Sequence, residues 1–410
     1  MENTWGMQPA PSGMNFSAAP AAAMWWDTCP IGAQQFRGST NETPPTQTHE
    51  PLVDVLEEIG IGSTNGSHTI LDIKAFRDSI GDRPIFNRSV MLDAANQLTA
   101  ARYGRDVTLT NYRGERRVRS AQRLLLPNQI PVLLYAGIHH LVDQWQDDRI
   151  NNDDISPILI DSGQRVEELG DVNDFSQLMA MLDLSKRLWR KSHLRSHLLD
   201  SVQKLKHTAR ISNIVCIGLG TLHTLDPNKN NPIIQHVVAS ALAQYLTRMY
   251  EAEGMPLEKP IRIIAQDPAY TLRDRQILSK LPVPIEVVTD PEGFLAINES
   301  SLVYSAFAMV PVKQIVADLA AATPDGKGPA ALFVNNDFRD KIHGNVDRAV
   351  YDRDQPGRLA NPETKRYLTM LGSYTRVMDG QKLKGMFYLR TFPTGGYNWF
   401  TGMDIWARGE

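Results

Sequence analysis

Glycine, acidic and hydroxyl residues that could take part in chemistry follow short apolar segments in the second half of the chain. Gly218 and Gly220 come after NIVCI, and Asp267 comes after RIIAQ. A pair of acids, Asp290 and Glu292, comes after IEVVT. Continuous apolar segments of this kind are typical of strands buried on both faces of a parallel sheet. Because the carboxyl ends of such strands meet at one edge, we expect these five residues to bind a substrate there.

Three further residues are candidates for catalysis at the same edge. Ser305 ends the segment SLVYS and could accept an acyl group, provided that a base activates its hydroxyl. His223, just after the glycine turn, is the nearest base expected from the strand order. Tyr270 and Asp274 stand four residues apart on a predicted helix and could share a face towards the pocket. A plain buried serine and an exposed Asp274 are the alternative interpretations.

The acids at this edge also allow two interpretations each. Asp290 and Glu292 could bind a guanidinium or ammonium group in bidentate fashion, which an arginyl substrate would require. Acids in a loop are otherwise simply solvated. Asp267 precedes Pro268, so its carboxylate could contact a substrate or could accept backbone amides within a turn.

The glycine turn differs from a dinucleotide-binding fingerprint. That fingerprint needs G-x-G-x-x-G with a helix opening at the turn, but His223 occupies the third glycine position here. The polar loop TLHTLDPNKNNP separates the turn from the next predicted helix. Asp267 also lies well beyond the usual spacing of about 20 residues for the ribose-binding acid. We therefore expect neither NAD nor another cofactor. Metal ligands at suitable spacing are also missing from the sequence.

A basic segment precedes the first of these strands. Residues 186–210 contain eight Lys or Arg against one acid, Asp200, and are predicted to form a helix. Five basic side chains share one side at helical spacing: Lys186, Arg190, His193, His197 and Lys204. Leu184, Leu188 and Leu198 are expected on the core-facing side. With the five arginines of 113–123, this side could follow a phosphate backbone, as in tRNA; an ordinary solvated face is the alternative.

The order of predicted elements indicates an α/β fold with a Rossmann-like parallel sheet and flanking helices. Strands and helices alternate over 211–338, whereas 51–210 is predicted to be mostly helical, including helices over 90–104 and 127–145. Residues 1–50 are rich in Ala, Pro, Ser and Thr and nearly free of charge, which predicts a disordered tail. The extension 339–410 has no assignable fold.

Composition narrows the class of protein further. A net charge of −3 excludes a globally basic nucleic-acid binder, and DNA is not an expected partner. Two cysteines allow no disulfide framework or cysteine metal cluster and suit a reducing compartment. No segment approaches the roughly 18 apolar residues that span a bilayer, and no targeting segment is recognisable. These features indicate a soluble cytoplasmic protein without a membrane partner; its oligomeric state is not predicted.

The segments IVCIGLGT, IIAQDPAYTLRDRQIL, VVTDPEGFLAI and SLVYSAFAMVPVKQIVADL resemble the Sensitivity-to-Red-light-Reduced (SRR)-like domain family, as a divergent, fungal-type member. The resemblance covers about residues 212–337 and implies a strand with a glycine turn, an Asp-Pro and a later Pro motif. Other family members carry a Pro-His-Cys type motif after the fourth strand. Here AFAMVPVKQ keeps Pro311 but lacks the histidine and the cysteine.

Two functions follow from this resemblance. Chains of this type also resemble the arginine-containing cyclodipeptide synthases, which join two aminoacyl-tRNAs into a cyclic dipeptide in secondary metabolism. That implies an aminoacyl-transfer enzyme that needs no cofactor and has aminoacyl-tRNA as its partner. The Asp-Asp-x-x-Glu motif of those enzymes is not present in this form. The alternative is a non-catalytic SRR-like regulatory or scaffold protein.

Overall fold

The structure is a computed structural model. It describes the second of two units into which the chain divides, Met1–Thr43 and Pro44–Glu410. The described residues are 68–120, 129–164, 175–222, 231–336, 346–353, 360–383 and 399–409. The predicted tail therefore lies outside the described residues. No helix in these ranges has both the length and the apolar character that crossing a membrane requires.

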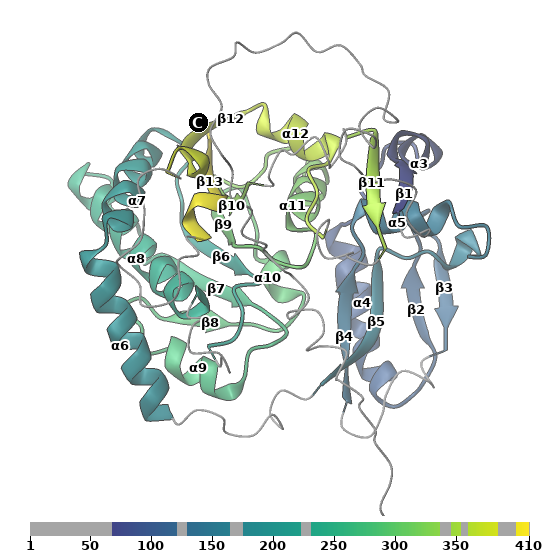
Figure 1. Cartoon of the computed structure of the whole chain (residues 1–410), viewed down its shortest axis with the longest axis horizontal. Coiled ribbons are helices and arrows are strands. Elements are labelled where there is room, and N and C mark those ends of the chain that lie inside the picture. Colours follow the sequence, from purple (N-terminus) through teal and green to yellow (C-terminus); the bar gives the residue numbers. More distant parts are fainter. Residues whose placement is uncertain are drawn as a thin grey trace, which may run out of the picture. The chain divides into compact units, whose positions relative to one another are not determined.

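A seven-stranded sheet in the order β12-β13-β10-β9-β6-β7-β8 runs through the described part of this unit (Figure 1). Its strands are β6 (Asn213–Ile217), β7 (Arg262–Gln266), β8 (Ile285–Val287), β9 (Ser301–Ser305), β10 (Ala331–Asn335), β12 (Tyr374–Asp379) and β13 (Met403–Arg408). Strands β6 to β10 are parallel, and β13 runs antiparallel to both of its neighbours. The sheet is thus mostly parallel, and it gains two strands from the extension whose fold the sequence did not predict.

The alternation of strands and helices predicted over 211–338 is confirmed. The helices are α8 (Asn231–Ala252), α9 (Leu272–Leu278), α10 (Glu292–Leu295) and α11 (Val312–Ala321). Helix α9 begins at a capping box, in which Thr271 and Asp274 satisfy each other's backbone amides. Strands β6, β9 and β10 are buried on both faces, as the continuous apolar patterns predicted. Strand β7 begins with the exposed Arg262, and β8 exposes Glu286 at its centre.

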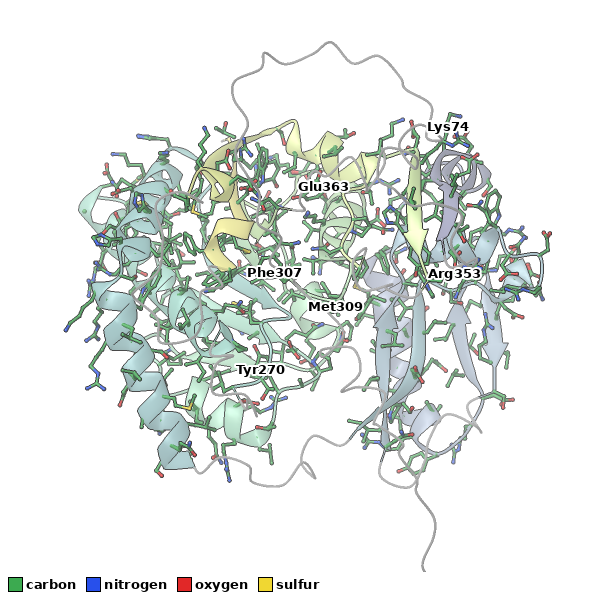
Figure 2. All side chains as sticks on the ribbon, in the orientation of Figure 1. Lys74, Tyr270, Phe307, Met309, Arg353 and Glu363 are labelled. Atoms are coloured by element: carbon green, nitrogen blue, oxygen red, sulfur yellow. The ribbon has the colours of Figure 1, made fainter. Side chains whose placement is uncertain are left out.

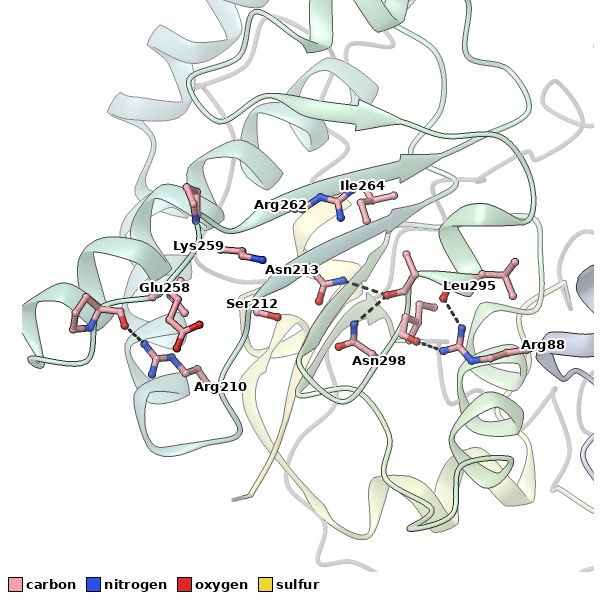
Figure 3. A pocket seen from close by; sticks show the side chains of 15 residues that line it. Arg88, Arg210, Ser212, Asn213, Glu258, Lys259, Arg262, Ile264, Leu295 and Asn298 are labelled. Carbon is pink, nitrogen blue, oxygen red and sulfur yellow. Dashed lines mark hydrogen bonds between the residues drawn. The ribbon is translucent and has the colours of Figure 1, made fainter.

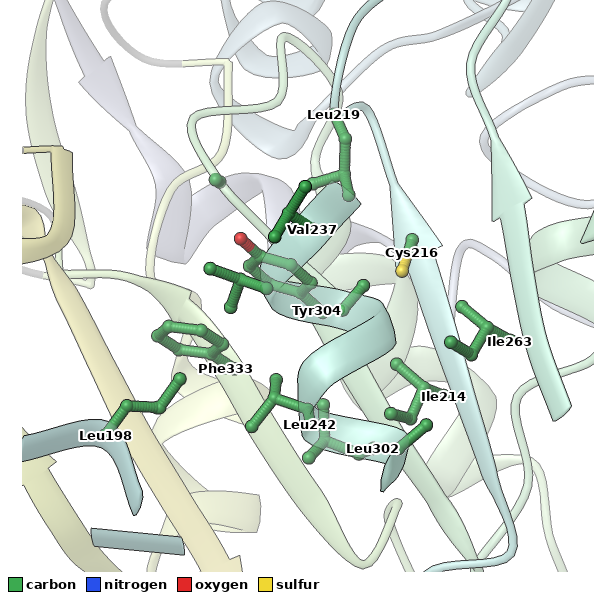
Figure 4. Close-up of a cluster of buried hydrophobic side chains, with 14 of the residues drawn as sticks. Leu198, Ile214, Cys216, Leu219, Val237, Leu242, Ile263, Leu302, Tyr304 and Phe333 are labelled. Carbon is green, nitrogen blue, oxygen red and sulfur yellow. The ribbon is translucent and has the colours of Figure 1, made fainter. Parts of the chain in front are cut away.

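Successive residues of each strand enter different cores on the two faces of the sheet. Cys216, Tyr304 and Phe333 pack against one layer of helices (Figure 4). This layer consists of α6 (Phe175–Lys191), α7 (His193–Gln203), a 3-10 helix (Lys204–His207), α8 and α9. Val215 and Val303 pack on the opposite face, against α10, α11 and the elements that precede residue 165. Both faces are therefore covered, as an α/β protein requires.

The elements before residue 165 mix helices with short antiparallel pairs. They are β1 (His68–Asp72), α3 (Ile73–Ser79), α4 (Arg88–Arg102), β2 (Val107–Thr110), β3 (Arg116–Arg119), β4 (Gln129–Tyr135), α5 (Ile138–Trp145), a 3-10 turn (Asn152–Asp154) and β5 (Ile158–Gln164). Strand β1 pairs with β11 (Arg348–Asp352), β2 with β3, and β4 with β5. Near the end of the chain lie α12 (Lys365–Leu371) and two 3-10 turns (Gly380–Leu383, Trp399–Gly402).

The helix predicted over 127–145 is wrong in its first half. Residues 129–135 form β4, and only 138–145 are helical, as α5. Pro131 lacks the amide that a helix interior needs, but it is tolerated in a two-stranded sheet. Leu133 and Tyr135 are buried and Leu134 is exposed, an alternation that fits a strand. The helix predicted over 90–104 is confirmed as α4.

Candidate functional site

The strand order reverses between β6 and β9. From β6 the chain continues to β7 and β8 on one side, and then returns to place β9 and β10 on the other. In open parallel sheets, ligands bind outside the carboxyl ends of the strands near such a reversal. The turns that follow β6, β7, β8 and β9 hold the substrate-binding candidates, and Figure 2 labels Tyr270 after β7 and Phe307 after β9.

The glycine turn after β6 allows a close contact with the segment that follows β9. Gly218 and Gly220 have φ of +68° and +81°, which most other residues avoid. A Cβ atom on Gly218 would lie 2.6 Å from the Cβ of Ala308. Gly218 thus lets two turns of the sheet edge pack together, whereas a Cβ atom on Gly220 would lie 3.3 Å from Pro232 of α8. These contacts are a structural reason for the two glycines that needs no bound phosphate.

We expect Gly218→Ala to lower the free energy of unfolding by about 2–4 kcal/mol, because positive φ and the clash with Ala308 add up. Gly254→Ala is the matched control: Gly254 has φ +70°, and a Cβ atom added there would meet no atom within 4 Å, so only the backbone cost applies. Urea unfolding of both variants measures the difference. Equal losses of stability in the two variants would mean that the clash with Ala308 adds nothing to the backbone cost of Gly218→Ala.

Two acids at this edge serve the backbone. Asp267 accepts hydrogen bonds from the amides of Gly220 (2.8 Å) and Ala269 (2.9 Å), which favours its interpretation as a turn residue. Burial raises the pKa of Asp267. Asp274 is wholly buried rather than exposed, and its carboxylate accepts from the amide of Leu222 (2.9 Å) and the hydroxyl of Thr221 (2.8 Å). The alternative of an exposed Asp274 is therefore wrong.

Tyr270 points into the core beneath α8 and not into an open pocket. Its hydroxyl lies 2.6 Å from Nε2 of His236, whose Nδ1 lies 2.6 Å from the carbonyl oxygen of Pro232. Because a carbonyl only accepts, Nδ1 carries the proton, and the Tyr270 hydroxyl donates to Nε2. Burial lowers the pKa of His236 to about 4, so the imidazole is neutral at physiological pH. Sequence reasoning missed His236, which looked like one residue of an apolar helix.

Asp290 is the acid at this edge that keeps an available oxygen. Its Oδ1 accepts from the hydroxyl of Tyr135, at the end of β4, and from Nε2 of Gln266 (3.0 Å). Gln266 is oriented in turn by the amides of Gly293 (2.7 Å) and Phe294 (3.3 Å), which donate to its Oε1. Oδ2 accepts from none of the described residues. The side chain is half-buried.

The environment of Asp290 raises its pKa to about 7. Burial is the largest cause, and the nearby charge of Asp267 adds to it. The hydrogen bonds from Tyr135 and Gln266 act in the opposite direction, because they favour the carboxylate. A half-buried carboxyl with this pKa exchanges protons near neutral pH, which is a property of acid–base groups in active sites.

Glu292 does not share the contacts of Asp290. Glu292 is the first residue of α10, and its side chain is exposed. Its Oε2 accepts a hydrogen bond from the amide of Thr289 (3.0 Å). The two carboxylates thus have separate hydrogen-bond partners. Their joint binding of a guanidinium stays a prediction.

Ser305 ends β9 and is fully buried, and its hydroxyl has no hydrogen-bond partner among the described residues. His223, the base expected to activate it, lies outside the described residues, so this pairing stays a prediction. Two residues later, Phe307 has φ +57°, which is unusual for a bulky side chain and strains the backbone. Strain of this kind gathers at functional edges.

The predicted basic helix is interrupted, so its five side chains do not share one side. Helix α6 ends at Lys191, and Ser192 caps α7 by accepting from the amide of Arg195 (3.2 Å). Lys186 pairs with Asp183 at 3.2 Å, and Lys204 donates to the carbonyl of Val377 at 3.2 Å. Of the five, Arg190 and His193 are exposed without a partner among the described residues, while His197 is half-buried.

The core-facing side of this segment also differs from the prediction. Leu184 is 43% exposed, whereas Leu178, Leu182 and Trp189 are buried. In the part of the segment before Ser192, the prediction of which helix face is buried is therefore wrong. After Ser192, Leu198 is buried as expected.

Three of the four described arginines within 113–123 form ion pairs. Arg113 and Arg119 pair with Asp153 (3.3 Å) and Asp154 (3.0 Å), and Arg117 pairs with Glu115 (2.6 Å). Strand β2 of this hairpin contributes to the core on the face of the sheet opposite to α6 and α7. The two basic segments therefore do not form one continuous track.

Comparison with known proteins adds one match. Residues 191–368, fewer than half of the chain, match the family model described as the SRR1 domain. The resemblance found in the sequence is thereby supported, and the match extends beyond 212–337 at both ends. It includes the whole carboxyl edge of β6 to β9. Neither a curated protein nor a solved structure matches the chain.

Proposed function

We propose that the chain is an acyl-transfer enzyme that takes an aminoacyl substrate at the carboxyl edge of its sheet, with Asp290 as the proton acceptor. The observation that carries this proposal is the geometry of one carboxylate. Oδ1 is held by Tyr135 and Gln266, and Oδ2 remains available. A pKa of about 7 lets the same group take up and return a proton at neutral pH.

An aminoacyl-tRNA suits this group because its ester is already activated. The α-ammonium group of one substrate, whose pKa is about 8, gives a proton to Oδ2 of Asp290. The freed amino nitrogen attacks the ester carbonyl of the second substrate. A C–N bond forms, the C–O bond to the tRNA ribose breaks, and the proton passes from Asp290 to the ribose oxygen. The second proton that the attacking nitrogen loses as the amide forms passes to water. A second such step closes a cyclic dipeptide and releases the second tRNA.

Two features support this proposal. The order of the parallel strands reverses between β6 and β9, and such a reversal favours a ligand site. The exposed Arg190 and His193, at the junction of α6 and α7, support an anionic substrate such as tRNA. In the proposal, arginine remains the expected side chain of one substrate.

The test is expression of the full chain in a bacterium, with mass spectrometry of extracts against an empty vector. We expect a new mass that matches a cyclic dipeptide. Asp325→Asn is the matched control for Asp290→Asn, because it makes the same change at an exposed loop carboxylate. Asp325→Asn should keep the product and Asp290→Asn should lose it. Soluble wild-type protein without any new mass would contradict the proposal.

A regulatory or scaffold role is the second candidate, and one observation favours it. Asp267 and Asp274 are occupied by local backbone amides, and the hydroxyl of Ser305 is buried. Much of the carboxyl edge is therefore structurally engaged. In this case Asp290→Asn would leave the capture of a partner protein unchanged and no product would form in any extract.

A further inference from the structure

A second site lies at the opposite, amino edge of the sheet. The hollow there is lined by the start of β6, the start of β7, the segment 256–260 and the segment 295–298 (Figure 3). Its volume of about 780 Å³ is in the range of small-molecule sites. Asp290 follows the carboxyl end of β8, so this hollow is distinct from the proposed acyl-transfer site.

Basic side chains outnumber acidic ones in the lining. Arg88, Arg210, Lys259 and Arg262 stand around the hollow, and Glu258 is the one acid among its lining residues. Figure 3 shows Arg88 on one side, Arg210 on the other, and the remaining two between them. An excess of positive charge around a concave surface raises the local concentration of anions.

Two of the guanidinium groups are fixed in place without being neutralised. Arg88 donates to the carbonyl oxygens of Leu295 and Ile297. Arg210 donates to two backbone carbonyl oxygens at 255–256, and its guanidinium carbon lies 5.3 Å from the ring centroid of Tyr250. Neither has a carboxylate partner among the described residues. Each guanidinium has five N–H donors, so several remain for a ligand.

The other two cations are accessible. Lys259 is exposed and has no partner within the described part of the chain. Arg262 pairs with Glu286 at 2.7 Å, but both side chains are more than half exposed (67% and 55%). Exposed pairs of this kind contribute only about 0–1 kcal/mol, so an anion can compete for Arg262.

We propose that this hollow binds the phosphate groups of a small phosphorylated molecule. Arginine and lysine are the side chains that bind phosphate best, and two arginines here are already positioned. A compact anion fits better than a long nucleic acid, because the cations surround a depression and the chain as a whole carries a net charge of −3.

The test is isothermal titration of the full chain with inorganic tripolyphosphate and with ATP, at low salt. The variant is Lys259→Gln/Arg262→Gln, which changes two exposed residues. Arg149→Gln/Lys327→Gln is the matched control, since it removes the same charge at two exposed basic side chains outside the hollow. Urea midpoints of both double variants verify that the fold is intact.

We expect tripolyphosphate to bind the wild type and the control equally, and to bind the hollow variant at least tenfold more weakly. Tighter binding of ATP than of tripolyphosphate would assign a nucleoside to the ligand, whereas equal binding would assign phosphate alone. Absence of binding to the wild type, or equal loss in both double variants, would overturn the proposal. Binding of a short RNA without binding of tripolyphosphate would also overturn it, in favour of a nucleic-acid surface.

Discussion

Asp290→Asn should reduce product formation at least 100-fold while the protein stays folded. Asparagine keeps an oxygen that can accept from Tyr135 and Gln266, but it cannot take up a proton. The loss would therefore come from chemistry and not from a collapsed site. Quantitative mass spectrometry of extracts, normalised to soluble protein, gives the fold-change.

The same variant, although it should lose activity, should be relatively more stable than the wild type at pH 8. The pKa of Asp290 in the folded protein, about 7, lies above its ordinary value of 3.8, so folding favours the protonated form. The stability gained from that form is fully present below about pH 4 and is lost as the pH rises through 7. The Asp290→Asn variant cannot titrate at this position, so its free energy of unfolding has no such pH-dependent loss.

Urea unfolding at pH 5 and pH 8 checks this sign. We expect the wild type to lose more stability between these two pH values than Asp290→Asn, so that the variant is relatively more stable at pH 8. A carboxylate with an ordinary pKa would be ionised in both the folded and the unfolded protein over this range, so the wild type and the variant would then lose equal stability. Equal or steeper loss in the variant would thus count against a raised pKa.

Asp318→Ala should lower the free energy of unfolding by about 3–5 kcal/mol, the largest stability effect that we expect. Asp318 is wholly buried on α11, and its Oδ2 accepts from the amides of Ile85 (2.9 Å) and Phe86 (3.0 Å). Its Oδ1 pairs with Arg366 of α12 at 2.5 Å. Alanine would leave two buried amides and a half-buried guanidinium without this acceptor.

Asp318→Asn separates the two contributions, because its amide oxygen can still serve Ile85 and Phe86 while the charge beside Arg366 is lost. We expect a loss between that of alanine and zero, measured by urea unfolding at pH 7. Asp325→Ala is the control, since an exposed loop carboxylate should change stability by no more than about 0.5 kcal/mol. A loss below about 1 kcal/mol for Asp318→Ala would mean that this junction is not a stabilising contact.

The parallel core of the fold was predictable from local patterns. Strands β6, β9 and β10 are short apolar segments bounded by turn residues, and burial on both faces leaves that signal in consecutive residues. Strands β12 and β13 were not predictable, because residues 380–402 separate the two antiparallel partners in the sequence and Arg376 interrupts the apolar pattern of β12.

The candidate site was predictable in part. Asp290 and Asp267 follow strands, and the rule for parallel sheets places both at one edge. Tyr135 was not predictable as the partner of Asp290, since it lies 155 residues earlier in a segment predicted as helix. The break at Ser192 was missed, although serine is a preferred N-cap residue and caps α7 here.

The proposed mechanism depends most on the ionisation of Asp290, which carboxyl ¹³C NMR measures directly. The full chain would be labelled at its aspartate carboxyls and titrated from about pH 3 to about pH 9, a range that spans the ordinary and the raised pKa values. The signal absent from Asp290→Asn identifies the residue. We expect a midpoint near 7 for this signal. A midpoint at or below the ordinary value of 3.8 would show a carboxylate that is always ionised at neutral pH, and would contradict its role as the proton acceptor.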